Sequence, residues 1–174
     1  MWNRIKIKWW SWKFRRHCTN AGDRLTVLGP CTVHSSGEMK VGDGLTIRSR
    51  KFNMVEITCA ANAKLTFGNK VFLNQGVRIA CTNEVTLGDN ALIGDETVIL
   101  DSDYHGVADG KTKSAPVHIE RDVWLGTRVI VLRGVTIGAG SVVGAGAVVT
   151  RSLPPRVFAA GVPARVVKNL SESK

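Results

Sequence analysis

The sequence predicts an all-β protein, a solenoid of short parallel strands whose triangular coils contain 18 residues each. An aliphatic residue occupies every sixth position of one long stretch: Ile119, Leu125, Val131, Ile137, Val143 and Val149. A glycine directly follows three of these residues, as Gly126, Gly138 and Gly144. A period of six matches neither an α-helix nor a single alternating strand. Three strands per coil, each with one inward aliphatic side chain and a tight corner after it, explain the period.

The same spacing is present earlier in the chain, but it is less regular. From Phe67 it runs in two groups of three, separated by a two-residue slip: Phe67, Leu73 and Ile79, then Leu87, Ile93 and Ile99. Before that, Val27 to Val33 and Val41 to Ile47 predict irregular first coils. We therefore expect a basic, Trp-rich N-terminal segment over 1–24 and the solenoid over 25–153.

Two stretches break the hexad pattern. Residues 101–118 lack its aliphatic residues, so we expect a loop that protrudes from the coil. Pro154 and Pro155 mark the end of the regular coils, because proline cannot donate a hydrogen bond to a sheet. The tail, 154–174, contains PARVVKNL (163–170), which predicts a short C-terminal helix.

Composition and charge narrow the classes of protein. The chain has 174 residues and a net charge of +10, and it has no apolar run of about 18 residues that would predict a membrane-spanning helix. Its four cysteines are widely spaced and form no C-x-x-C pair, which favours reduced thiols and a cytoplasmic location. Lysines interrupt the apolar residues at the N-terminus, so we do not expect a secretory signal.

Residues 1–16 contain six basic residues, no acidic residue and four of the five tryptophans. On a helix, Trp2, Ile5, Trp9 and Trp12 would form one apolar stripe; as a strand, Ile5 and Trp9 would instead share a face with Ile7. The segment would then cap the open end of the solenoid, pack on a neighbouring subunit, or touch an anionic membrane. Nucleic acid is the least favoured partner.

The hexad [LIV]-G-x-x-[STAV]-x and the segment 123–170 resemble the hexapeptide-repeat acyltransferases. Within that superfamily the chain is most similar, from about Leu65 onward, to sugar O-acetyltransferases of the maltose, galactoside and nodulation-factor type. The resemblance implies a left-handed coil, acetyl-CoA as co-substrate, and a homotrimer with active sites between subunits. It implies O-acetyl transfer to a saccharide, which we expect to belong to a surface polymer such as capsule, O-antigen or exopolysaccharide. A free sugar or a xenobiotic is the alternative acceptor.

The segment DSDYHGV places His105 where the family has its catalytic histidine. An imidazole suits the removal of a hydroxyl proton at neutral pH. Asp101 or Asp103 would orient this histidine, or would instead bond backbone N–H groups in a turn. The sequence contains no cysteine or serine where a covalent nucleophile would be needed, so we expect direct attack in a ternary complex.

The resemblance also implies acceptor contacts. Asn74, in FGNKVFLNQG, matches the asparagine that binds the acceptor sugar in the family, and Tyr104 adjoins His105. A stacked asparagine at a solenoid corner is the structural alternative. Thr82 stands where the family usually has an acceptor-binding aspartate, so the identity of the acceptor stays open.

For the donor, the match implies contacts along the pantetheine arm and at the phosphates of coenzyme A. The residues concerned are Trp124, Gly126, Thr127, Ala145, Thr150, Arg165 and Lys168. We expect no metal, because the four histidines, His17, His34, His105 and His118, lack the H-x-x-x-x-H spacing of a γ-type carbonic anhydrase. A non-catalytic scaffold solenoid is the remaining alternative.

Overall fold

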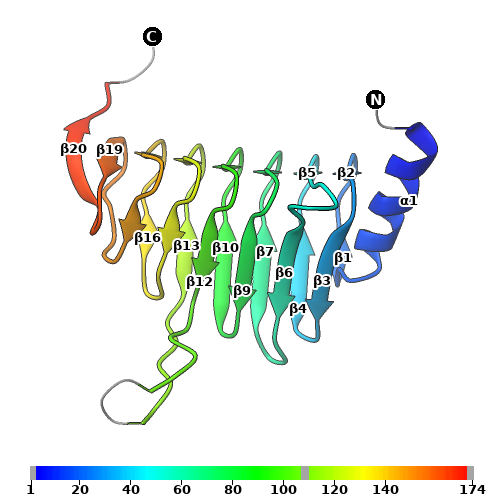
Figure 1. The fold of residues 1–174 in the computed structure, drawn as a ribbon, viewed down its shortest axis with the longest axis horizontal. Helices are drawn as coiled ribbons and strands as arrows, with labels where there is room; N and C mark the ends of the chain where they lie inside the picture. Colours follow the sequence, from blue (N-terminus) through cyan, green and yellow to red (C-terminus); the bar gives the residue numbers. More distant parts are fainter. Residues whose placement is uncertain (1–2, 107–109, 172–174) are drawn as a thin grey trace.

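The computed structural model describes residues 3–106 and 110–171. The chain forms an elongated solenoid with one helix across its N-terminal end (Figure 1). All strands but the last pair in parallel, in three sheets that form the three sides of the coil. The prediction of an all-β protein built from parallel sheets is confirmed.

The sheets each contain one strand from successive coils. Sheet A contains β1 (Asn20–Ala21), β4 (Glu38–Val41), β7 (Lys64–Phe67), β10 (Glu84–Leu87), β13 (Val117–Ile119) and β16 (Thr136–Ile137). Sheet B contains β2 (Thr26–Leu28), β5 (Thr46–Arg48), β8 (Phe72–Leu73), β11 (Leu92–Ile93), β14 (Trp124–Leu125), β17 (Val142–Val143), β19 (Val157–Ala160) and β20 (Arg165–Asn169). Sheet C contains β3 (Cys31–Ser35), β6 (Val55–Cys59), β9 (Arg78–Cys81), β12 (Val98–Leu100), β15 (Ile130–Val131) and β18 (Val148–Val149).

The register of the sheets gives the length of each coil. Trp124 pairs with Val142, so the two strands are 18 residues apart in sequence. In earlier coils the paired residues are further apart in sequence, as for Phe72 and Leu92, which are 20 residues apart. The interval of 32 residues between Leu92 and Trp124 shows that the extra chain between β12 and β13 leaves the coil as a loop, which projects below the solenoid in Figure 1.

The hexad aliphatics form the core. All six of those between Ile119 and Val149 have 0% of their surface exposed. Glycine follows them because neighbouring coils approach closely: a Cβ on Gly126 would lie 2.8 Å from the backbone nitrogen of Ala145. The hexad glycine is therefore required by lack of space, and its stacking keeps the coils in register.

The predicted C-terminal helix is wrong. Residues 165–169 form β20, which pairs antiparallel with β19 after a tight turn. Strand β19 is the last parallel strand of sheet B, so its outer edge has unpaired N–H and C=O groups. Pairing with this edge satisfies the backbone of residues 165–169, whereas a short isolated helix is only marginally stable in water. The solenoid also exceeds the predicted 25–153 at both ends, because β1 pairs with β4 and β19 with β17.

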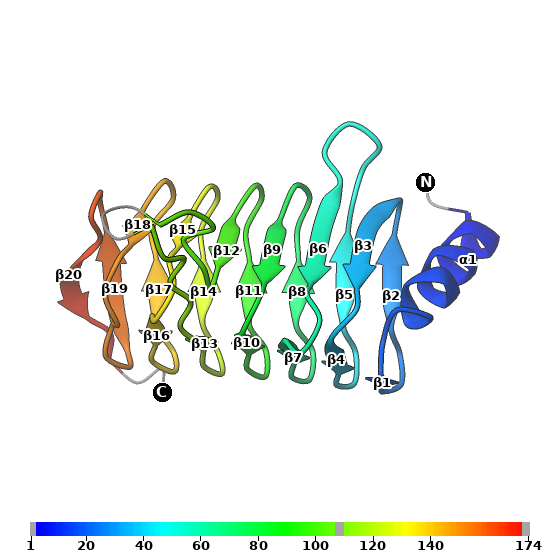
Figure 2. The same cartoon turned by 90° about the horizontal axis from the view of Figure 1, so that it is seen from below.

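Residues 4–15 form helix α1 (Arg4–Arg15), so the strand alternative for this segment is wrong. The Asn3 side chain accepts a hydrogen bond from the Ile5 N–H and caps the helix. Phe14 is 1% exposed and covers the open end of the core, where α1 packs against β2 (Figure 2). Trp2, which the sequence places on the apolar stripe, lies outside the described residues. No helix of the described chain has the length and apolarity needed to cross a membrane.

Candidate active site

The protruding loop is anchored by a buried carboxylate at its start. Asp101 is 0% exposed and accepts hydrogen bonds from the Thr82 N–H at 2.8 Å, the Thr82 hydroxyl at 2.8 Å and the Asn83 N–H at 2.7 Å. Its own carbonyl accepts from the Ala115 N–H at 2.9 Å, on the returning side of the loop. Asp101 therefore holds both sides of the loop against the preceding coil, and its carboxylate points toward Thr82.

His105 lies on the exposed part of this loop. Its backbone N–H donates to the Asp103 carbonyl at 2.7 Å, and Tyr104 between them has a φ of 57°, so the chain turns sharply here. The Tyr104 side chain is 46% exposed. Partial burial and the charges of Asp101 and Cys81 raise the pKa of its phenol. The tight turn fixes the point at which the His105 side chain leaves the backbone.

Asp103 makes a second contact between the loop and the solenoid. Its Oδ2 lies 2.7 Å from Nε of Arg133, which stands at the corner of the next coil, after β15. Both side chains are about one third exposed. The carboxylate thus fixes the loop to the solenoid, and the predicted role in orienting His105 stays a prediction. Arg133 was missed in the sequence, because nothing in the hexad pattern marks a basic residue 30 positions away as a partner of the loop.

Thr82 stands at the base of the loop. Its hydroxyl hydrogen is donated to Asp101, so only its oxygen lone pairs remain for a ligand. The neighbouring Cys81 is buried, and burial together with the Asp101 charge raises the pKa of its thiol far above the usual range. The resemblance implies an acceptor-binding aspartate at position 82. In this chain Thr82 occupies that position and holds the carboxylate of Asp101.

Asn74 lies on a different corner, the one between sheets B and C. Its side-chain NH₂ donates to Asp95 Oδ2 at 2.9 Å, and its Oδ1 accepts from the Gln75 N–H at 3.0 Å. Asn74 is thus a stacked corner residue, as the structural alternative had it, with further lone pairs and one N–H left for a ligand. Asp95 is a neighbour that the sequence analysis did not single out.

The predicted donor residues Gly126, Thr127 and Ala145 continue the same corner as Asn74. The Thr127 carbonyl accepts from the Gly146 N–H at 2.9 Å, which stacks one coil on the next. Both Thr127 and Ala145 are exposed there. One row of the predicted site residues therefore runs along a single edge of the solenoid.

His105, Thr82 and Thr150 occupy the corner between sheets C and A, since each follows a strand of sheet C. The two rows thus flank sheet C, whose strands separate them by roughly 15 Å at about 3.3 Å per residue. Within a single chain the residues of each row lie along one edge of sheet C. The predicted donor residue Thr150 therefore lies on the side of His105, apart from Gly126 and Thr127, and His105 does not lie next to those two residues.

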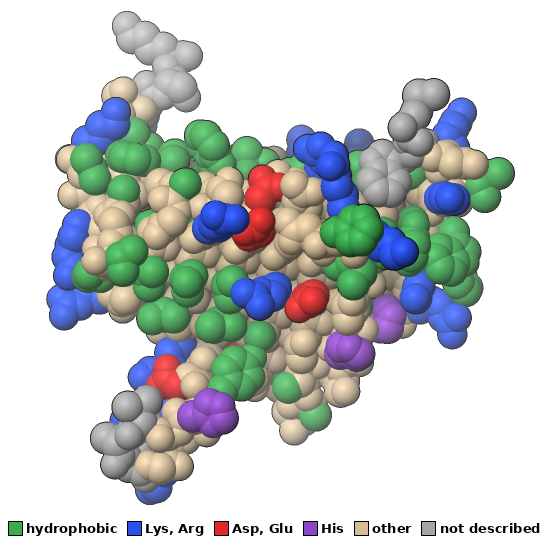
Figure 3. Space-filling view, in the orientation of Figure 1, with side chains coloured by type: hydrophobic (Ala, Val, Ile, Leu, Met, Phe, Trp, Pro, Cys, Tyr) green, Lys and Arg blue, Asp and Glu red, His purple; other side chains and the backbone are tan. Residues whose placement is uncertain are grey.

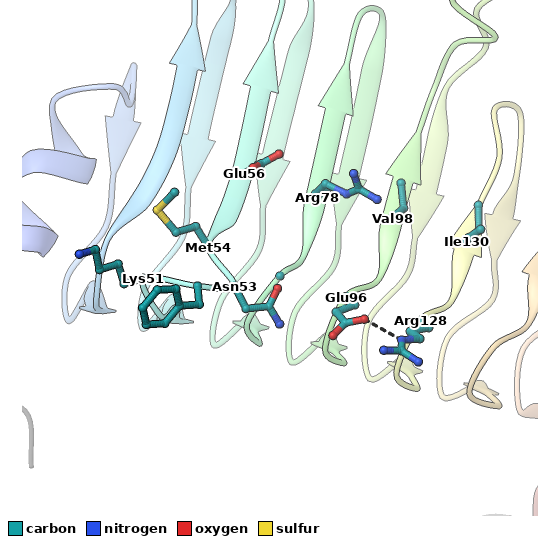
Figure 4. Close-up of a pocket in the computed structure, with 11 residues that line it drawn as sticks. Lys51, Asn53, Met54, Glu56, Arg78, Glu96, Val98, Arg128 and Ile130 are labelled. Atoms are coloured by element: carbon teal, nitrogen blue, oxygen red, sulfur yellow. Dashed lines mark hydrogen bonds and ion pairs between the residues drawn. The ribbon is translucent and has the colours of Figure 1, made fainter.

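A groove of about 550 Å³ lies on the outer face of sheet C between the rows (Figure 4). The segment 51–54 overhangs one side of it, and Arg78 lines its floor. Glu96 and Arg128 form an ion pair of 2.6 Å at its rim, and the hydrogen bond from Arg128 lowers the pKa of Glu96. A second hollow of about 360 Å³ continues from Arg78 toward Tyr104. Figure 3 shows charged side chains near the middle of this face and the loop that projects beyond it.

The remaining predicted donor residues belong to sheet B. The Trp124 side chain, on β14, is 53% exposed. Arg165 and Lys168 are exposed on β20, where the register sets Lys168 opposite Phe158 of β19. The antiparallel pairing, which sequence reasoning missed, thus holds both cations at the sheet B side of the molecule.

Within residues 3–106 and 110–171, no cluster of three or more His, Cys, Asp or Glu side chains is arranged to hold a metal ion. The four cysteines of the chain are free thiols. Among the described residues, the groups available for chemistry therefore include an exposed imidazole on an anchored loop, the phenol of the preceding residue, and a row of backbone groups at the opposite edge of sheet C.

Comparison with known proteins shows the family of this chain. Residues 116–151 match the family model described as bacterial transferase hexapeptide (six repeats). The chain is 31% identical over 152 residues to the putative lipopolysaccharide biosynthesis O-acetyl transferase WbbJ of Escherichia coli (strain K12), with 80% of this chain and 76% of that protein aligned. The chain belongs to the hexapeptide-repeat transferase family, as the repeat in its sequence predicted.

Two further relatives are similar over most of the solenoid. The galactoside O-acetyltransferase of Escherichia coli (strain K12) is 38% identical over 115 residues, which cover 63% of this chain and 56% of that protein. A hexapeptide-repeat acetyltransferase from Vibrio cholerae O1 biovar eltor, solved with acetyl coenzyme A, superposes with a TM-score of 0.61 at 28% identity, over 91% of this chain and 74% of the other. The chain spans about half the length of the first curated relatives that it matches.

Proposed function

We propose that this protein is an acetyl-CoA-dependent O-acetyltransferase that acetylates a hydroxyl of a saccharide. The observation that carries the proposal is the exposed His105 on a loop that a buried carboxylate and an ion pair both hold in place. A scaffold solenoid has no need of such an anchored histidine. Relatives named as O-acetyltransferases support the reaction class.

In the reaction, the His105 imidazole removes the proton of an acceptor hydroxyl as its oxygen attacks the thioester carbonyl. A backbone N–H near Gly126 steadies the oxyanion of the tetrahedral intermediate. The intermediate then expels the thiolate of coenzyme A, which takes up the proton from the imidazolium. The products are the O-acetyl saccharide and free coenzyme A.

For the binding sites, we propose Asn74, Thr82 and Tyr104 on the acceptor, with Asp103 bracing the catalytic loop. Trp124, Gly126 and Thr127 would lie along the pantetheine arm, with Ala145 and Thr150 further on. Arg165 and Lys168 would then meet the phosphates. Charge complementarity supports the last assignment, because both cations are exposed on one strand.

We also propose a homotrimer of left-handed coils in which each site is shared by two subunits. The separation of the two rows by the width of sheet C supports it, because His105 of one subunit would have to meet the donor row of the next. The acceptor would be a saccharide of a surface polymer, as the name of the relative WbbJ suggests for that protein, and we place the enzyme in the cytoplasm.

The first test follows free thiol release from acetyl-CoA, and acetylated product by mass, over a panel of mono-, oligo- and lipid-linked saccharides. His105→Ala is expected to reduce turnover by about 10²- to 10⁴-fold. His118→Ala is the matched control, since it removes a half-buried histidine of sheet A outside both rows. Equal turnover in wild type and His105→Ala would refute the mechanism.

The shared site has a separate test. Light scattering should give the mass of three chains. Co-expressed His105→Ala and Thr127→Trp chains should regain activity that neither variant has alone, because mixed trimers contain sites with both rows intact; Thr127 is exposed, so a large side chain there blocks the donor row without entering the core. A monomeric mass, or no recovery of activity in confirmed mixed trimers, would contradict the shared site. Neither result would decide the role of His105, which the first experiment tests.

A further inference from the structure

Helix α1 is fixed to the end of the solenoid by its inner face. Phe14 is buried, and Trp10 packs partly buried against the core cluster. The Ser11 hydroxyl accepts a hydrogen bond from the Val27 N–H at 2.9 Å, at the start of the first coil. The helix therefore has a defined rotation about its own axis, and its opposite face is directed away from the solenoid (Figure 2).

That outer face exposes three large apolar side chains. Ile5, Trp9 and Trp12 are 75%, 50% and 55% exposed. At 3.6 residues per turn they form one stripe, roughly opposite the stripe that contains Trp10 and Phe14. Capping the solenoid explains the inner stripe alone, so the outer stripe requires another explanation.

Basic side chains flank the outer stripe on both sides. Arg4 and Lys8 lie along one side, Lys6 and Lys13 lie along the other, and Arg16 follows the stripe itself; all five are exposed. The helix contains no acidic residue. Arg15 is exposed too, but its guanidinium is engaged within the chain, where it donates to the carbonyls of Ala21 and Gly22.

Two of these cations also contact the exposed aromatic rings. Lys13 Nζ lies 5.6 Å from the ring centre of Trp9, and the Arg16 guanidinium lies 5.0 Å from that of Trp12. The cations are thereby held beside the apolar stripe rather than spread away from it.

We propose that the outer face of α1 docks the end of the solenoid on a bilayer surface that contains anionic lipids. Ile5, Trp9 and Trp12 would enter the boundary between headgroups and acyl chains, where tryptophan keeps its N–H toward water. The flanking lysines and arginines would extend to the lipid phosphates, which attract each cation near the surface.

The charge pattern favours this partner over two others. A second copy of the chain would bring two cationic helices together without an acidic residue on either. A nucleic acid would meet the cations, but its phosphates would leave the central stripe of Ile5, Trp9 and Trp12 without an apolar partner. An anionic lipid surface offers an apolar layer for the stripe and phosphates for the flanking cations.

The docked orientation sets the distance between the bilayer and the loop that contains His105. What this distance implies for the acceptor rests on the proposed function. Helix α1 lies across the end of the coil (Figure 1), so the long axis of the solenoid stands away from the bilayer. Sheet C places β12 three strands beyond β3, and with strands about 4.8 Å apart and a helix about 10 Å thick the loop lies roughly 25 Å from the lipid. A lipid-linked saccharide suits this distance better than a free sugar does.

The test is sedimentation of the full chain with vesicles of phosphatidylcholine alone or of equal parts phosphatidylcholine and phosphatidylglycerol. Wild type should bind the anionic vesicles preferentially, and binding should weaken with salt. Lys6→Gln with Lys8→Gln should weaken it by about fivefold per cation. Trp9→Ser with Trp12→Ser should weaken it by about tenfold or more. Lys64→Gln with Lys70→Gln is the control, which removes equal charge from exposed positions elsewhere and should leave binding unchanged.

Equal affinity for both vesicle types, an equal loss in the control, or unchanged binding in the tryptophan variant would overturn the proposal. So would tighter binding to an oligonucleotide than to vesicles, with the same variants weakening it. Thermal melting verifies folding, and the lysine variant carries the test if the tryptophan variant does not fold. Vesicle binding does not depend on acetyl transfer, so the outcome of this test can be interpreted even if the proposed reaction is refuted.

Discussion

Asp101→Asn tests how the loop is held. The Asp101 carboxylate accepts two backbone N–H groups and one hydroxyl, at 2.7 to 3.0 Å, and is fully buried. Asparagine keeps the shape but replaces one acceptor oxygen with an NH₂ group. That group would face a buried N–H, which would lose its partner and gain none.

The magnitude follows from these contacts. Hydrogen bonds to a charged group contribute about 1.5–3 kcal/mol each, and a buried donor without a partner costs a similar amount. We expect Asp101→Asn to lower the free energy of unfolding by about 2–4 kcal/mol. Thr82→Val removes only the hydroxyl bond to the carboxylate, at about 1.5–3 kcal/mol, and the double variant should lose less than the sum of the two.

The same change should lower activity, because the loop that contains His105 begins at this residue. Urea unfolding gives the stability, and steady-state kinetics of acetyl transfer give kcat and KM. We expect kcat to fall by about tenfold or more, as a misplaced catalytic group does. The KM for acetyl-CoA should change little, since the predicted donor row lies on the other side of sheet C.

Asp43→Asn is the matched control. Asp43 also accepts a backbone N–H through its carboxylate, from Asp23 at 2.7 Å, but at an exposed corner far from the loop. Its effect should stay within about 0.5 kcal/mol, as at most surface positions. If Asp101→Asn were as mild as this control in both stability and kcat, the reasoning about the anchor would be refuted.

Three further predictions concern the solenoid. Ile137→Ala, at a fully buried hexad position, should cost about 2–5 kcal/mol in urea unfolding, and a loss below about 1 kcal/mol would mean that the core does not depend on it. Gly94→Ala should cost about 1–3 kcal/mol, since its Cβ would lie 2.6 Å from a backbone carbon of the next coil; wild-type stability would show that the coils can separate. Burial raises the pKa of the Cys18 and Cys31 thiols to about 11, above the ordinary value of 9.0. The unfolded chain therefore loses these protons first, and stability should fall as pH rises from about 9 to 11, by less than about 3 kcal/mol per thiol because both side chains are partly exposed to solvent. Replacing both cysteines with alanine should flatten that decline, and an unchanged pH profile would contradict the cause.

The periodic part of the fold could be read from the sequence because its contacts repeat. Each aliphatic hexad position meets the equivalent position of the next coil, so the pattern that predicts burial also predicts the stacking. The loop was predicted for the same reason, as an interval without hexad aliphatics. Helix α1 was visible as an apolar stripe, although its second stripe, the buried one around Phe14, was not.

The C-terminal tail shows where local pattern fails. PARVVKNL was predicted to form a helix, but its local preference is weak, and its conformation depends on the free edge of β19 beside it. That edge exists only once the last coil has formed. No property of residues 163–170 alone could have predicted their antiparallel pairing.

By itself, the sequence determined the repeat, the core and the family, and it supplied the candidate residues of the proposed site, because each is a property of short segments or of residues at fixed spacing. The tertiary structure decided which of those residues meet. Asp103 pairs with Arg133 and Asp101 with Thr82 only because stacking brings distant segments to one corner. It also set His105 and Gly126 at opposite edges of sheet C, since the side on which a residue stands depends on every corner that precedes it.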